Sequence, residues 1–156
     1  MRVFREVDRD GFVPIGLPRG DGDGPMTSAK HVVAAAVIVW KDDRLLALRR
    51  SPHKVGAGLW EVVSGRIEVG EEPLECAMRE VKEETSLEVS VDERPVATYA
   101  AKRGDEAMIV IVYRARWVDG EVELDHEHDE HRWVDVDAFD ALSSLKPLVK
   151  AARRCR

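Results

Sequence analysis

Three glutamates near the middle of the chain have the type and spacing of a metal site. Glu80, Glu83 and Glu84 fall within one turn of a predicted helix, so their carboxylates share one stripe of its surface and repel each other. Arg79 and Lys82 are expected to project elsewhere on the helical wheel. The simplest compensating charges are therefore divalent cations bound by carboxylate oxygens, such as Mg²⁺. The alternative is a solvated acidic face without a ligand.

The helix that must carry these glutamates is predicted over residues 73–85. Pro73 suits the first turn, and the acidic residues around it complement the positive end of the helix dipole. Apolar residues recur at i, i+3, i+4 and i+7, which predicts one buried stripe. This stripe consists of Leu74, Ala77, Met78 and Val81.

The glutamates belong to a longer spaced pattern that resembles the Nudix box, Gly-x5-Glu-x7-Arg-Glu-U-x-Glu-Glu-x-Gly-U, where U is aliphatic. The matching residues are Gly65, Glu71, Arg79, Glu80, Val81, Glu83, Glu84 and Leu87. Ser86 stands where the family has glycine. A glycine just past a helix usually takes a left-handed conformation, so we expect Ser86 to be accommodated there at modest cost.

The resemblance extends over about residues 31–142 and implies the α/β class of fold, namely the Nudix α/β/α sandwich with a mixed β-sheet between helices. It also implies hydrolysis of a nucleoside diphosphate linked to another moiety. The metal ligands it implies are Glu80, Glu83, Glu84 and the carbonyl of Gly65, with Mg²⁺ or Mn²⁺ as the cofactor.

By the same resemblance, Arg79 orients the carboxylates through an ion pair with Glu71 or a neighbour. The general base is predicted to be Glu83 or Glu127, with Glu80 mainly a ligand. Family members differ in which carboxylate takes the proton, so both candidates stay open.

A second acidic cluster lies at residues 125–133, DHEHDEHRW. In many Nudix enzymes an acid shortly before a Trp-Val strand completes the metal site or acts as general base. Glu127 and Glu130 both precede Trp133, and we place Glu127 first. The three histidines leave two alternatives, an independent zinc site and a solvent-exposed polar loop.

Three residues before the box are candidates for substrate binding. Arg49 and Arg50 end a predicted strand, where alternation sends them to opposite faces. Either can meet a substrate phosphate or lie on the surface. Trp60 can stack on a base, although a core position is favoured.

The remaining elements alternate loosely between strand and helix, which predicts a mixed sheet between helices. Residues 31–40 are apolar on both faces, as expected for a strand covered on each side, and residues 107–117 are expected in the centre of the sheet. The other predicted strands are 44–50, 59–64, 87–102 with a bend at 92–95, and 121–124 after a turn at Asp119-Gly120. Asp137 is expected to cap a short helix to Leu142, and Ser144 a last helix to Arg154.

The 156 residues are enough for one domain, predicted over 31–156 after an N-terminal extension at 1–30 that is partly flexible. That extension can add a strand or form an arm exchanged between subunits, so a monomer and a homodimer both stay open. A net charge of −6 argues against nucleic acid as a partner. No apolar run has the length of a membrane span, and no signal peptide is evident, so a cytoplasmic protein is predicted.

The substrate class follows by elimination. No signature outside the box favours ADP-ribose, coenzyme A or dinucleoside polyphosphates, which leaves a (d)NTP pyrophosphohydrolase of MutT type. An ADP-ribose or nucleotide-sugar pyrophosphatase is the alternative within the family. The alternative of another class is a non-catalytic sensor with the same fold, but such proteins tend to lose the acids that this chain keeps.

Overall fold

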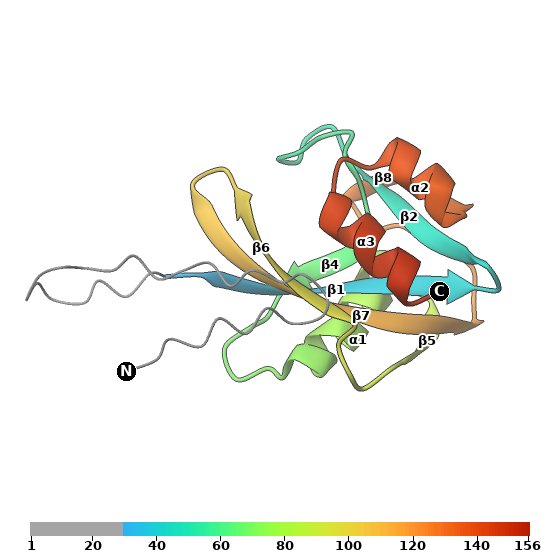
Figure 1. The fold of residues 1–156 in the computed structure, drawn as a ribbon, viewed down its shortest axis with the longest axis horizontal. Coiled ribbons are helices and arrows are strands. Elements are labelled where there is room, and N and C mark those ends of the chain that lie inside the picture. The colour runs from blue at the N-terminus through green and yellow to red at the C-terminus, as the bar shows by residue number, and fades with distance from the viewer. Residues whose placement is uncertain (1–29) are drawn as a thin grey trace, which may run out of the picture.

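The computed structural model describes residues 30–156, which form a mixed sheet between helices (Figure 1). The strands are β1 (Val32–Lys41), β2 (Arg44–Arg50), β3 (Trp60–Glu61), β4 (Val63–Arg66), β5 (Glu88–Val91), β6 (Ala97–Arg103), β7 (Glu106–Asp119) and β8 (His128–Val134). The helices are α1 (Pro73–Thr85), α2 (Val136–Leu142) and α3 (Lys146–Arg154). The bounds of β2 and α1 agree with the sequence prediction residue for residue.

Strands β1 and β7 form the centre of the sheet. They run parallel from the pair Val32 and Met108 to the pair Trp40 and Arg116. The order is β3-β2-β1-β7-β5, while β4 pairs with β1, β6 with β7, and β8 with β2. The predicted central position of β7 is confirmed, and β1 and β2 form the predicted hairpin.

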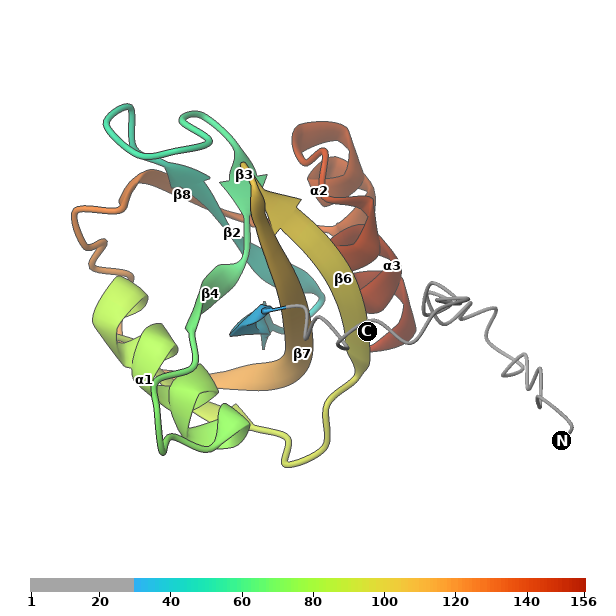
Figure 2. The ribbon, with the colours of Figure 1, turned by 90° about the vertical axis from the view of Figure 1, so that its left-hand side faces the viewer.

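Helices cover both faces of the sheet. Alternate residues of β1 point to opposite sides, so each face of this strand packs into its own core cluster. Ala36, Ile38 and Trp40 belong to a core cluster with α2 and α3. Ala35, Val37 and Val39 belong to a second cluster with Cys76, Ala77 and Val81 of α1. Figure 2 shows α1 on one side of the strands and α2 and α3 on the other, which confirms the expected α/β/α sandwich.

Two strand predictions were wrong. The predicted strand 59–64 is broken at Val62, because β3 pairs with β2 whereas β4 pairs with β1. Residues 121–124 form no strand: the backbone N–H of Glu123 instead donates to the carbonyl of Thr85 at the end of α1. The next strand begins only at His128, inside the cluster for which a loop was one interpretation.

Both predicted caps of the C-terminal helices were also wrong. The side chain of Asp135, not that of Asp137, accepts a hydrogen bond from the backbone N–H of Ala138, so α2 begins at Val136. Residue Leu145, not Ser144, occupies the N-cap of α3.

The proposals made for residues 1–29 lie outside the described residues. Within residues 30–156, the helices are too short and too polar to cross a bilayer.

Ser86 ends α1 in the left-handed conformation, with φ 60° and ψ 4°, and its backbone N–H donates to the carbonyl of Lys82. The predicted accommodation of a serine at this glycine position is therefore confirmed. A residue with a Cβ is strained there.

We expect Ser86→Gly to stabilise the protein by about 1 kcal/mol, or about 2 to 4 °C in Tm, because glycine adopts this conformation without a Cβ clash. Thermal unfolding followed by circular dichroism measures the shift. Ser90→Gly, in the exposed part of β5, is the control and should lower the Tm. A Tm for Ser86→Gly at or below that of the parent would contradict the prediction.

Candidate active site

Strand β4 and helix α1 bring Gly65 and Glu80 of the box to a cavity of about 430 Å³, and Glu84 lies next to it, bonded to the lining residue Ser64. Glu61, Glu80 and Glu127, together with Gly65, form what we call the acidic wall. Side chains from β6, β7 and the α3 region form what we call the apolar wall. These are Tyr99, Ala101, Met108, Val110, Leu145 and Leu148.

Glu84 is the most deeply buried carboxylate of the site, with 1% of the residue exposed. It accepts one hydrogen bond, from the backbone N–H of Ser64 at 3.3 Å. Burial raises the pKa of Glu84 to about 10, and the negative charges of Glu61, Glu80 and Asp125 act in the same direction. Without a bound cation, Glu84 is therefore protonated at neutral pH.

Arg79 is the cation that compensates the other box carboxylates. Its guanidinium contacts Glu71 at 2.7 and 3.0 Å, Glu80 at 2.7 Å and Glu83 at 3.1 Å. The predicted pair with Glu71 is confirmed, and it lowers the pKa of Glu71 to about 2. The expectation that Arg79 points away from the glutamate stripe was wrong, because Arg79 and Glu83 are i, i+4 neighbours on the helix and the long side chain also reaches Glu80.

Gly65 lies directly against Glu80. A Cβ at this position would collide with both carboxylate oxygens of Glu80. Glycine is therefore required for the carboxylate to lie beside the backbone of β4, where the Gly65 carbonyl is also located. Burial raises the pKa of Glu80, while the neighbouring Arg79 opposes that shift.

Glu127 lines the same cavity from the segment that precedes β8. Its carboxylate accepts a hydrogen bond from Nζ of Lys54 at 2.8 Å, which lowers the pKa of Glu127. Glu130, the other candidate, pairs with Arg49 and Arg132 and does not line the cavity. Of the two candidate glutamates before Trp133, Glu127 is the one that lines the cavity.

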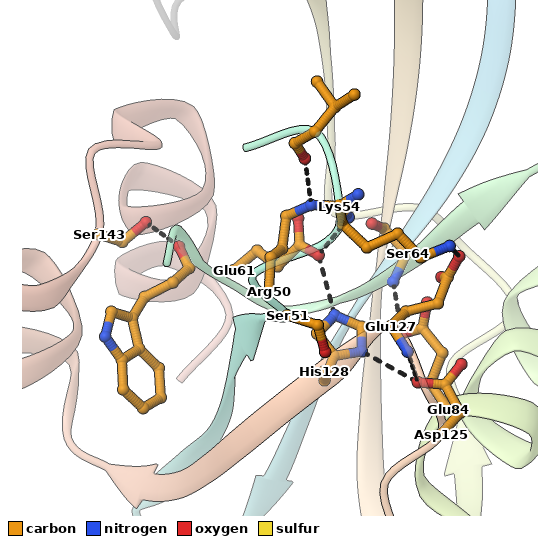
Figure 3. Close-up of polar contacts among 12 residues, drawn as sticks. Arg50, Ser51, Lys54, Glu61, Ser64, Glu84, Asp125, Glu127, His128 and Ser143 are labelled. Atoms are coloured by element: carbon orange, nitrogen blue, oxygen red, sulfur yellow. Dashed lines mark hydrogen bonds and ion pairs between the residues drawn. The ribbon is translucent and has the colours of Figure 1, made fainter. Parts of the chain in front are cut away.

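A buried network around Glu61 of the acidic wall was missed by sequence reasoning (Figure 3). Oε1 of Glu61 lies 3.0 Å from Nη1 of Arg50 and 3.0 Å from Nε2 of His128. The other ring nitrogen of His128 lies 3.4 Å from Asp125, which also accepts from the backbone N–H of Glu127. A glutamate in an otherwise apolar strand was the signal for Glu61.

The three residues proposed for substrate binding lie in different environments. Arg50 is buried and lines the cavity, whereas Arg49 lies outside it and pairs with Asp129 and Glu130. The predicted opposite orientation of the two arginines is thus confirmed. Trp60 is 8% exposed and belongs to the core cluster with α2 and α3, so its ring offers little surface to a base.

The three histidines of the second acidic cluster do not converge. His128 is buried, while His126 and His131 are exposed. Throughout residues 30–156, no three histidine, cysteine or acidic side chains are already gathered around a metal position, and this holds for the second acidic cluster and for the box carboxylates alike.

The box residues nevertheless suit a hard divalent cation by their chemistry. Glu84 is buried among three other carboxylates with a single hydrogen bond to satisfy it, and a cation would relieve that repulsion. All donors are oxygens, as Mg²⁺ and Mn²⁺ prefer. Glu83 is less well placed as a ligand than Glu84, since its side chain is 57% exposed and bonded to Arg79.

The family follows from comparison with known proteins. The NUDIX domain matches residues 30–155. The chain belongs to the Nudix family. Its Nudix domain is 34% identical to an octanoyltransferase of Myxococcus xanthus over 76% of this chain, and to a MutT-like protein of Streptomyces ambofaciens over 68%. The matches cover 33% and 64% of those two proteins.

The fold of this Nudix domain matches solved structures. The crystal structure of the MutT protein from Methanosarcina mazei Go1 superposes with a TM-score of 0.71, at 24% identity, over 80% of this chain and 91% of that one. At this level of identity the likeness establishes the fold alone.

We expect Glu84→Gln to stabilise the metal-free Nudix domain at pH 8 by about 1 kcal/mol or more. Since the folded-state pKa of Glu84 lies above its ordinary value of 4.5, the unfolded chain releases a proton that the folded protein keeps. The free energy of unfolding contributed by this group is therefore full below pH 4.5 and falls as the pH rises toward 10.

Urea unfolding in EDTA between pH 5 and 9 measures this effect. Glu84→Gln should flatten the decline with pH, whereas Glu88→Gln, which removes the same charge from an exposed position, should keep it. An unchanged slope in Glu84→Gln would show that Glu84 does not retain the proton.

Proposed function

We propose that this Nudix domain is a pyrophosphohydrolase of MutT type, which hydrolyses a (d)NTP to a nucleoside monophosphate and pyrophosphate with Mg²⁺ or Mn²⁺. One observation carries the proposal: a single cavity joins the acidic wall to the apolar wall. A nucleotide likewise has a charged part and an apolar part: its phosphates are charged, and its base is flat and apolar on both faces.

The size of the cavity supports a single nucleotide as substrate. A volume of about 430 Å³ is near the lower end of the range for small-molecule sites. In this arrangement Tyr99, Leu145 and Leu148 of the apolar wall contact the base and sugar. The phosphates lie toward Gly65 and Glu80.

The chain also offers cations to the phosphates. Arg50, Arg66, Lys102 and Arg103 line the cavity. Arg50 and Arg66 are already paired with Glu61 and Glu106, so their charge is partly neutralised. Lys102 and Arg103 remain for the phosphates, and two charges alone are a poor match for a triphosphate beside the acidic wall, which supports a requirement for a divalent cation.

Glu80, Glu84, Glu127 and the Gly65 carbonyl are the groups that would hold this cation, with Glu83 at the periphery. When bound, the cation neutralises the diphosphate and lowers the pKa of water. Arg79 and Gly65 hold Glu80 in place, and the hydrogen bond from Ser64 orients Glu84.

The protein must also accept a proton. When the oxygen of the attacking water bonds to phosphorus and the P–O bond of the diphosphate breaks, the water proton passes to a carboxylate. Glu127 lines the cavity, whereas Glu83 is mostly exposed and bonded to Arg79. Position therefore favours Glu127 over Glu83 as the general base.

We expect turnover of one class of nucleotide in a panel of dNTPs, 8-oxo-dGTP, ADP-ribose and UDP-sugars with Mg²⁺ or Mn²⁺. Glu84→Gln should lower kcat by more than about 100-fold, because the central carboxylate of the metal site loses its charge. Measurement of phosphate and pyrophosphate release distinguishes the substrate classes.

Glu88→Gln is the matched control and should keep parental activity. Turnover of ADP-ribose or UDP-sugars in place of dNTPs would favour the alternative pyrophosphatase. If no compound is hydrolysed, the catalytic proposal fails and a nucleotide sensor becomes the better explanation.

A further inference from the structure

Lys54 links the loop between β2 and β3 to the acidic wall. Its Nζ lies 2.8 Å from Oε1 of Glu127, and both side chains are partly buried, at 26% and 32% exposure. The two residues that follow it, Val55 and Gly56, line the cavity together with Glu127. Lys54 itself does not line the cavity, but its ammonium reaches the edge of the site through the contact with Glu127, which does.

Lys54 also differs from Arg79 and Arg50, the two other cations that bond to carboxylates of the acidic wall. Arg79 divides its guanidinium among three carboxylates, and Arg50 is held by Glu61 and the carbonyl of Val55. Among the described residues, Glu127 is the one partner of the Lys54 ammonium. Since an ammonium carries three donors, Lys54 can bind a further anion or change partner at lower cost than either arginine.

The contact with Lys54 competes with the role assigned to Glu127. Lys54 occupies Oε1, one of the two oxygens that this carboxylate can offer to a cation or a proton. Release of Glu127 would leave a partly buried ammonium without a counter-ion, which is unfavourable. A substrate brings phosphate oxygens to the same cavity, and these can replace the lost partner.

We propose that Lys54 exchanges partners when substrate binds, leaving the carboxylate of Glu127 and binding a phosphate oxygen of the nucleotide. This inference rests on the proposed function. It makes Lys54 a substrate-binding residue and at the same time the group that holds Glu127 in the free enzyme.

The backbone around the pair is suited to such an exchange. The backbone N–H of Ser51 donates to the carbonyl of Glu127 at 2.8 Å, and the Ser51 hydroxyl donates to the carbonyl of His126 at 3.0 Å. These bonds connect the two segments independently of Lys54. The side chains can therefore change partners while both loops stay in place.

The test is a double-mutant cycle with Lys54→Met and Glu127→Gln. The KM and kcat of each variant are measured with the best substrate found for the parent enzyme. Lys54→Met should raise KM by about 10- to 100-fold, because a charged hydrogen bond to phosphate is lost. The same rise should persist in the Glu127→Gln background, since the phosphate contact does not depend on Glu127. Lys54→Arg should restore most of the parental KM.

Calorimetry provides a readout that does not require turnover. With Mg²⁺ present, inorganic pyrophosphate should bind Lys54→Met more weakly than the parent, and Lys150→Met, which removes an exposed lysine of α3, should bind it like the parent. Thermal unfolding confirms that each variant is folded.

The outcomes separate this inference from the proposed function. If the parent hydrolyses nucleotides but Lys54→Met changes only kcat, and that change disappears in the Glu127→Gln background, Lys54 merely positions Glu127 and the exchange is wrong. Equal pyrophosphate affinity in the parent and Lys54→Met would also overturn it. Absence of parental turnover would count against the proposed function, while the calorimetry would still decide the role of Lys54.

Discussion

The burial of mutually repelling carboxylates beside β4 is the constraint on which the site depends. Glu61, Glu80 and Glu84 are 4%, 8% and 1% exposed, and each must be stabilised away from water. The chain uses three different means: Arg50 and His128 for Glu61, Arg79 for Glu80, and a retained proton for Glu84. Glu84 is thus the carboxylate with most to gain from an added cation.

The fold brings these carboxylates close together through small residues and through the packing of α1 against the sheet. Ala77 and Val81 of α1 pack against the face of β1 that carries Ala35 and Val37, which turns Glu80 and Glu84 toward β4. Gly65 then admits Glu80 to within contact of the strand backbone. A larger residue at 65 would separate the helix carboxylate from the Gly65 carbonyl, so the glycine at the start of the box is a packing requirement.

Local patterns in the sequence predicted the features that depend on local interactions. The bounds of α1 and the opposite orientation of Arg49 and Arg50 follow from periodicity, and the left-handed Ser86 follows from the box glycine that it replaces. The contacts that were missed are long-range: His128 and Glu61 are 67 residues apart. The orientation of His128 depends on an irregularity in the β2–β8 register beside Arg50, and local bulges of this kind leave no clear signal in residue order.

The contacts of Arg79 show how the charge balance of the helix was misjudged. Arg79 and Glu83 are i, i+4 neighbours on α1, so helical spacing itself places them together, and the long side chain also reaches Glu71 and Glu80. Arg79 therefore pairs with Glu71, Glu80 and Glu83 in the absence of any metal, and its single charge offsets one of their three. The need for a divalent cation is then concentrated at Glu84, the carboxylate that Arg79 does not contact. A phosphate group approaching the acidic wall meets the same repulsion, so under the proposed function the cation and the nucleotide must each raise the affinity for the other.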